Sequence, residues 1–254
     1  MEILFYSLSG ATVGLIVGIT GVGGGALMTP LLLLFGFPPH IAIGTDLWYA
    51  AITKSGGMWA HHRKQHVRWD IVLKLAAGSL PASAVTGLIL HRFFADAEQY
   101  ASLLQTALGA MLVVTALVLI FRRRLFQHSN PSQRVPPGRT TLWAIGAVLG
   151  VLVTLSSVGA GAIGTAVLMV LFPVLLPKQV VGTDIAHAVP LTFTAGVVHL
   201  FLGNVDFALL LALIAGSLPA IYLGTHLSAH LPSRVMHPLL ATALLVLGLK
   251  YAVF

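Results

Sequence analysis

Residues 18–30 read GITGVGGGALMTP and place five glycines among the eight residues Gly18–Gly25, inside an apolar segment. That segment, Ile3–Phe35, would be about 50 Å long as one helix, which is longer than one bilayer crossing needs. Central glycines weaken such a helix, so we expect two shorter helical pieces that meet at the glycines. Backbone broken inside a bilayer must be satisfied by protein or by a water-filled cavity. The stretch therefore predicts a broken membrane helix.

The composition indicates an integral membrane protein. Hydrophobic residues make up 57% of the 254 residues, charged residues make up 8%, and the mean hydropathy is +0.94. These values lie far outside the range of soluble proteins. Several of the apolar runs reach the roughly 20 residues that a membrane helix requires. We therefore predict an all-α, polytopic protein of the cytoplasmic (inner) membrane, in contact with the lipid bilayer. The chain has no cysteine, which excludes disulfides and thiol chemistry.

Two motifs recur at one constant spacing. The sequence GTDLWYAA at Gly44 returns as GTDIAHAV at Gly182, and GSLPA at Gly78 returns at Gly216, each 138 residues later. A spacing shared by separate motifs indicates an internal repeat. We predict a first membrane repeat at residues 1–122, a basic cytoplasmic linker at 123–138 and a second membrane repeat at 139–254.

The glycine-rich stretch is also repeated. Gly21–Thr29, GVGGGALMT, matches Ser157–Thr165, SVGAGAIGT, 136 residues later. Each half is therefore expected to carry a broken or short helix at its glycine-rich motif.

Lysine and arginine gather in connections between apolar runs, at His61–Arg68 and Phe121–Arg139. The positive-inside rule places both connections in the cytoplasm and explains the net charge of +7 without a nucleic-acid partner. The counterpart of the first cluster in the second half, Leu202–Asp206, has no lysine or arginine. This asymmetry predicts inverted-topology repeats, an arrangement common in secondary transporters, whose binding sites lie between the repeats.

Taken together, the GVGGG stretch, the two GTD motifs and the two GSLPA motifs resemble the TauE/SafE family of sulfite exporters, also called the TSUP family. The resemblance covers essentially the whole chain and implies transport of small sulfur-containing anions such as sulfite, thiosulfate or organosulfonates. The sequence departs from the serine that many members carry at the third GTD position, because it has Asp46 and Asp184 there.

The two glycine-rich breaks are the predicted substrate site, because exposed N–H groups at the start of a helix favour an anion and glycine permits close approach. Close helix packing is the alternative interpretation of these glycines. The predicted substrate-binding residues of the two breaks are Thr20, Gly21, Gly23, Gly24, Gly25, Ser156, Ser157, Gly159 and Gly161.

Lys54 lies inside an apolar run, seven residues before His61. It either extends to the interface or faces the site as the counter-charge of the anion or of an aspartate. Its counterpart in the second half, Thr192, is included in the predicted substrate site.

Asp46, Asp184 and His187 are candidates for proton coupling. His187 follows Asp184 by three residues on the same helical face, and such a pair can carry protons. The alternative places both aspartates in the first turn of their helices, where they complement the helix dipole.

Other classes of function lack residues that would support them. The histidines at 61, 62 and 66 stand among arginine and lysine, so a solvated basic loop is favoured over a metal site. No metal, cofactor, nucleotide motif or catalytic constellation is predicted, and an enzyme is not expected. The predicted function is secondary transport of small anions by alternating access. An anion channel, a carrier of non-sulfur carboxylates and a homodimeric assembly are left open.

Overall fold

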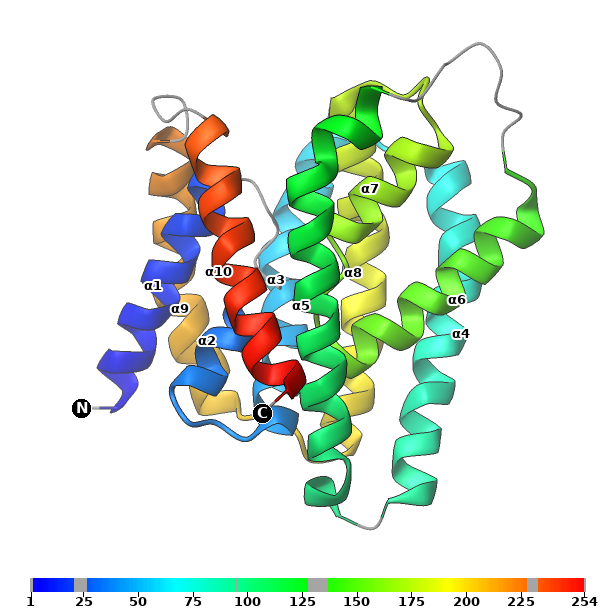
Figure 1. The fold of residues 1–254 in the computed structure, drawn as a ribbon. Helices are drawn as coiled ribbons and strands as arrows, with labels where there is room; N and C mark the ends of the chain where they lie inside the picture. The colour runs from blue at the N-terminus through cyan, green and yellow to red at the C-terminus, as the bar shows by residue number, and fades with distance from the viewer. Residues whose placement is uncertain (1, 21–26, 95, 128–136, 228–232, 254) are drawn as a thin grey trace.

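The fold is a bundle of helices, known from a computed structural model that describes residues 2–20, 27–94, 96–127, 137–227 and 233–253 (Figure 1). No strand occurs in these ranges. Five helices, α4, α5, α6, α8 and α9, are long and apolar enough to cross a membrane. The prediction of an all-α polytopic membrane protein is confirmed. The helices are α1 Glu2–Thr20, α2 Met28–Leu34, α3 Pro39–Arg63, α4 Trp69–Phe93, α5 Ala97–Gln127, α6 Arg139–Ser156, α7 Ala162–Leu171, α8 Pro177–Phe201, α9 Phe207–Leu227 and α10 Ser233–Val253.

The predicted break is present between α6 and α7. Ser157 ends α6 in the left-handed conformation, at φ 57°, and Gly159 and Gly161 follow with φ values of 114° and 152°. Glycine adopts these positive angles without the steric cost of a side chain. Helix α7 has 10 residues, or about 15 Å, so it is too short to cross the membrane. In the first half, the corresponding residues 21–26 lie outside the described residues, between α1 and the seven-residue helix α2.

The two GTD motifs lie well inside their helices. Helix α3 begins at Pro39 and helix α8 at Pro177, seven residues before Asp46 and Asp184 respectively. Proline begins a helix readily because an N–H group at the first helical position would have no intrahelical partner, so its absence costs nothing there. The interpretation that places the aspartates in the first helical turn is therefore wrong, since both lie about two turns farther on.

The halves pack through matching glycines. A Cβ on Gly10 of α1 would collide with the backbone of Leu213 in α9, and a Cβ on Gly146 of α6 would collide with the backbone of Leu75 in α4. Gly14 against Ser217 and Gly150 against Ser79 repeat these contacts one turn along. Each helix pair joins one predicted half to the other. Small residues allow this close approach between membrane helices.

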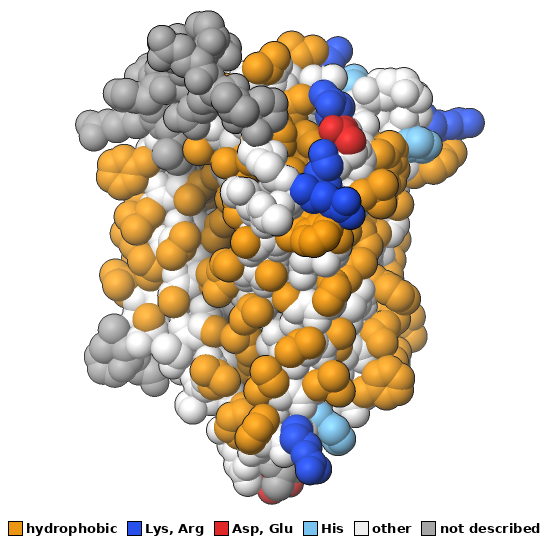
Figure 2. All heavy atoms as spheres, turned by 90° about the vertical axis from the view of Figure 1, so that its right-hand side faces the viewer, with side chains coloured by type: hydrophobic (Ala, Val, Ile, Leu, Met, Phe, Trp, Pro, Cys, Tyr) orange, Lys and Arg blue, Asp and Glu red, His pale blue; other side chains and the backbone are white. Residues whose placement is uncertain are grey.

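The ends of the bundle differ in charge. The C-terminal end of α3 and the start of α4 lie at one end of the molecule, and the starts of α5 and α9 lie at the other (Figure 1). On the face drawn in Figure 2, lysine and arginine gather mainly near one end, and hydrophobic side chains cover the area between the ends. This distribution fits a membrane-spanning bundle.

Candidate functional site

Two equivalent threonine–aspartate pairs lie at the centre of the bundle. Thr29 Oγ1 of α2 donates a hydrogen bond of 2.5 Å to Asp46 Oδ2 of α3, and both residues are fully buried. Thr165 Oγ1 of α7 donates a bond of 2.9 Å to Asp184 Oδ2 of α8, which is 4% exposed. Thr29 and Thr165 end the two matching glycine-rich motifs. Each short helix thus binds the aspartate of the long helix that follows it.

The break in the second half also reaches the aspartate of the first half. Ser157 Oγ donates to Asp46 Oδ2 at 3.0 Å. Ser156 Oγ instead donates to the Leu152 carbonyl at 2.6 Å and accepts the Val158 N–H at 3.2 Å, so it satisfies backbone groups at the end of α6. Asp46 therefore accepts two hydroxyl hydrogen bonds at Oδ2, whereas its buried Oδ1 has no hydrogen-bond partner among the described residues.

Lys54 lies inside the protein beside the same break. Its side chain is 9% exposed, and its ammonium donates a bond of 2.6 Å to the Ala160 carbonyl oxygen. It also interacts electrostatically with Asp184 and, more weakly, with Asp46. The single ion pair found within the described ranges joins Arg68 to Asp70, so Lys54 contacts neither aspartate directly. The alternative in which Lys54 extends to the membrane interface is wrong.

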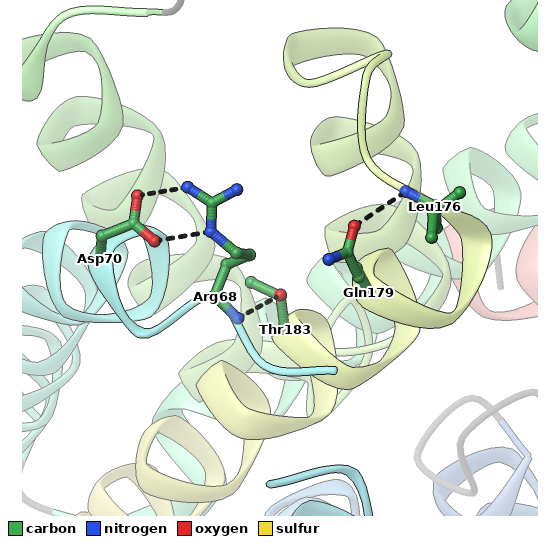
Figure 3. Close-up of polar contacts among 5 residues, drawn as sticks. All are labelled: Arg68, Asp70, Leu176, Gln179 and Thr183. Carbon is green, nitrogen blue, oxygen red and sulfur yellow. Dashed lines mark hydrogen bonds and ion pairs between the residues drawn. The ribbon is translucent and has the colours of Figure 1, made fainter. Parts of the chain in front are cut away.

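The glycine and threonine of each GTD motif hold a loop of the other half. Thr183 Oγ1 accepts the Arg68 N–H at 3.0 Å (Figure 3), and Thr45 Oγ1 accepts the Asp206 N–H at 3.1 Å. Gly182 lies directly against His66, and its counterpart Gly44 lies against Asn204.

The exposed Arg68–Asp70 ion pair lies at the start of α4, and the bond from the Leu176 N–H to Gln179 Oε1 lies at the start of α8 (Figure 3). In each GTD motif, the glycine and threonine therefore connect a loop of the opposite half to the buried aspartate that follows them.

His187 is buried one turn beyond Asp184. Its Nε2 lies 2.9 Å from Ser79 Oγ of α4, within hydrogen-bond distance. The matching position in the first half is Tyr49, which lies near Ser217, the counterpart of Ser79. The Tyr49 hydroxyl is buried and makes no hydrogen bond to any of the described residues. The structure thus places His187 against α4 and shows no hydrogen bond to Asp184.

The structure brings together one part of the predicted site. Of the predicted break residues, Ser157 contacts Asp46, and Lys54 bonds to the Ala160 carbonyl of the same break. Thr192 is buried, but its hydroxyl bonds to the Ala188 and Val189 carbonyl groups of its own helix. The other predicted residues lie outside the description: residues 21–26 include Gly21, Gly23, Gly24 and Gly25, and the side chain of Thr20 is likewise not described.

The histidine-rich loop forms a different arrangement. The ring centroids of His61 and His66 lie 5.6 Å apart. His62 Nδ1 accepts a hydrogen bond of 3.1 Å from the Trp69 indole N–H. Within the described ranges, no group of three or more histidine, cysteine, aspartate or glutamate residues could hold a metal ion.

Sequence reasoning missed Thr29, Thr165 and Gly164. The two threonines were visible as matching final residues of the repeated glycine-rich motifs, although nothing in that match identifies their aspartate partners. Gly164 is required because a Cβ at this position would collide with Asp184 Oδ1. Its role depends on a contact between α7 and α8 and has no local sequence signal.

A polytopic helical bundle with a broken helix beside buried ionisable groups belongs to the membrane-transporter class. The profile of the family described as "Sulfite exporter TauE/SafE" matches residues 6–251, and the chain belongs to this family.

Three relatives are named as transporters. "Probable membrane transporter protein YjnA" of Bacillus subtilis is 39% identical, covering 96% of this chain and 97% of the relative. "Probable membrane transporter protein YdhB" of the same species is 27% identical over 88% and 89% of the two chains. "Probable membrane transporter protein MJ0441" of Methanocaldococcus jannaschii is 24% identical over 94% and 91%. No solved structure matches the chain.

Thr29→Val and Thr165→Val are each expected to lower the free energy of unfolding by about 1–3 kcal/mol, because a buried carboxyl group loses a hydroxyl donor. Thermal unfolding of the purified variants in one detergent checks this. Thr12→Val is the control, because the Thr12 hydroxyl bonds only to its own helix at an exposed position. Equal unfolding temperatures for the three variants would contradict the expectation.

Proposed function

We propose that this protein is a secondary transporter that moves small sulfur-containing anions across the cytoplasmic membrane by alternating access. The family and the names of the relatives support membrane transport rather than catalysis. The observation that supports an anionic substrate is the position of Lys54, whose ammonium is buried beside the break between α6 and α7. A positive charge in this position is costly unless a negative group accompanies it.

The groups around Lys54 suit weak and reversible binding of an anion. Residues 140–171, which form most of α6, the break and α7, contain no ionisable side chain. Helix α7 has no side-chain cap at Gly161, and the N–H groups of Gly164 and Thr165 bond to the Gly159 and Gly161 carbonyls, which leaves the N–H groups of Ala162 and Ile163 for an anion. Neutral donors bind less strongly than charged donors, which favours release of the substrate. Substrate recognition is therefore assigned to Lys54, the Ser157–Gly161 segment and the start of α7.

Alternating access is attributed to the two halves as inverted repeats. Three observations support this assignment. Helices α3 and α8 run in opposite directions, as do α5 and α10 (Figure 1). The threonine–aspartate pairs recur in both halves. Thr45 bonds to Asp206 and Thr183 bonds to Arg68, each in a loop of the opposite half. The two threonines are 138 residues apart in the sequence, and so are their two partners. Rocking of one repeat against the other around a central site is the usual consequence of such symmetry.

The test is counterflow in proteoliposomes that contain the purified protein. Vesicles loaded with unlabelled sulfite, thiosulfate or methanesulfonate should accumulate the same labelled anion transiently, and uptake should saturate. Acetate loading tests the carboxylate alternative, and sulfate loading tests one further sulfur-containing anion. Non-saturating uptake without transient accumulation would indicate an anion channel, and no uptake of any sulfur-containing anion would refute the proposal.

The proposed topology can be measured separately. Met1 is assigned to the outside, with residues 61–68 and 122–139 inside and residues 203–206 outside. Cysteines introduced at Gln65 and Phe207, both exposed, should react with a membrane-impermeant reagent from opposite sides, and the native chain has no background cysteine. Asn204 is unsuitable because it is 1% exposed. Reaction from the same side would contradict the inverted arrangement.

A further inference from the structure

The buried charges of the site are unequal in number. One ammonium, Lys54, lies near two carboxyl groups, Asp46 and Asp184, and all three side chains are at least nine-tenths buried. Burial of a net charge is costly, so the protein has to keep the total charge of this set nearly constant during transport. A monoanion that enters next to Lys54 would add one negative charge. A compensating positive charge must therefore enter with it.

The two carboxyl groups are held differently. Asp46 Oδ2 accepts hydrogen bonds from both Thr29 and Ser157, at 2.5 and 3.0 Å. Within the described part of the chain, Asp184 Oδ2 accepts one hydrogen bond, from the Thr165 hydroxyl at 2.9 Å. Both carboxyl groups interact electrostatically with Lys54. The carboxyl group with fewer hydrogen-bond donors is held less firmly, and it is the one that an incoming anion would displace as the counter-charge of Lys54.

We propose that one proton travels with each monoanion and that Asp184 carries it. In the empty protein, ionised Asp184 balances Lys54. When the anion binds beside Lys54, a proton from the same side of the membrane forms an O–H bond on the Asp184 carboxylate. Anion and proton leave together on the other side, and Asp184 becomes the counter-charge again. This inference rests on the proposed anion transport and adds the coupling ion.

Among the described residues around Asp184, Lys54 is the one positively charged group. Helix α3 presents Lys54, and α7 presents only the Thr165 hydroxyl, because residues 140–171 of α6 and α7 have no ionisable side chain. Helix α4 presents Ser79, which pairs with His187 on α8. Asp46, with Tyr49 near it on α3, contributes the same charge before and after binding in either protonation state. The net exchange is therefore one proton for one negative charge.

The first experiment uses the wild-type protein in proteoliposomes with the membrane potential clamped at zero. Methanesulfonate is the probe, because this monoanion does not itself bind a proton near neutral pH. With one pH unit of gradient, acid outside, we expect about tenfold accumulation, since one proton per anion transmits the full gradient. An inward methanesulfonate gradient should also acidify the lumen, as read by a trapped pH dye.

The second experiment assigns the proton to Asp184. Asp184→Asn resembles the loaded, protonated form, so anion-for-anion counterflow should continue while accumulation driven by the pH gradient falls from about tenfold to about onefold. Asp70→Asn, the same change in an exposed ion pair, is the control and should accumulate like wild type. Thr165→Val is the second variant, because loss of the hydroxyl donor favours protonated Asp184 and should move the pH dependence of uptake toward higher pH.

The outcomes separate the two proposals. If the wild type shows no counterflow of any tested anion, the proposed function fails. If counterflow occurs but the pH gradient drives no accumulation and the lumen does not acidify, proton coupling fails while anion transport stands. Retained pH-driven accumulation in Asp184→Asn, or an unchanged pH dependence in Thr165→Val, would overturn the assignment to Asp184.

Discussion

Lys54→Gln is expected to lower the rate of anion uptake about 100-fold or more. Removing one partner of a buried, charge-assisted contact costs about 2–5 kcal/mol, and about 1.4 kcal/mol corresponds to a factor of ten. Lys54→Arg keeps the positive charge and should retain part of the activity. Initial rates of counterflow in proteoliposomes measure the effect. Lys250→Gln, which removes an exposed lysine near the end of α10, is the control.

The same variant should also lose stability, because Asp184 and Asp46 lose their positive neighbour. Adding Asp184→Asn to Lys54→Gln should restore part of the unfolding temperature without restoring uptake. This separation distinguishes a substrate contact from a purely structural charge. Wild-type uptake in Lys54→Gln would remove Lys54 from the site, and recovery of uptake in the double variant would assign Lys54 to the aspartate alone.

Gly164→Val is expected to reduce uptake by about 100-fold, because displacing a functional group by about 1 Å can cost a factor of this size. A side chain at position 164 would collide with Asp184 Oδ1 and push the carboxyl group away from Lys54 and Thr165. Uptake of methanesulfonate driven by the pH gradient is the measurement, together with gel filtration to verify that the variant remains folded.

Gly56→Val provides the matched control for this prediction. Gly56 lies in α3 and a Cβ there meets no atom within 4 Å, so uptake should stay near the wild-type rate. If Gly164→Val is folded and transports like Gly56→Val, the position of the Asp184 carboxyl group does not limit transport. That result would also weaken the assignment of the proton to Asp184.

The sequence predicted the helical class, the apolar helices and the break at Ser157–Gly161, because these features depend on local composition. An apolar run must bury its backbone groups in a helix within lipid, and closely spaced glycines weaken that helix at a definite place. The repeated GTD motifs identified Asp46 and Asp184, and Lys54 was recognised by its place inside an apolar run, where ionisable residues are rare. The prolines that begin α3 and α8 are an equally local signal, and they place the GTD motifs about two turns inside their helices.

The tertiary structure decided which of these residues meet. Ser157 and Asp46 are 111 residues apart. The repeated motifs give no indication that the break of one half bonds to the aspartate of the other. Lys54 and Ala160 are separated by 106 residues, and Gly164 matters only because α7 packs against Asp184. Hydropathy and motif spacing report what each segment prefers by itself. Partners across the bundle depend instead on how the helices cross, which is set by the packing of all the segments at once.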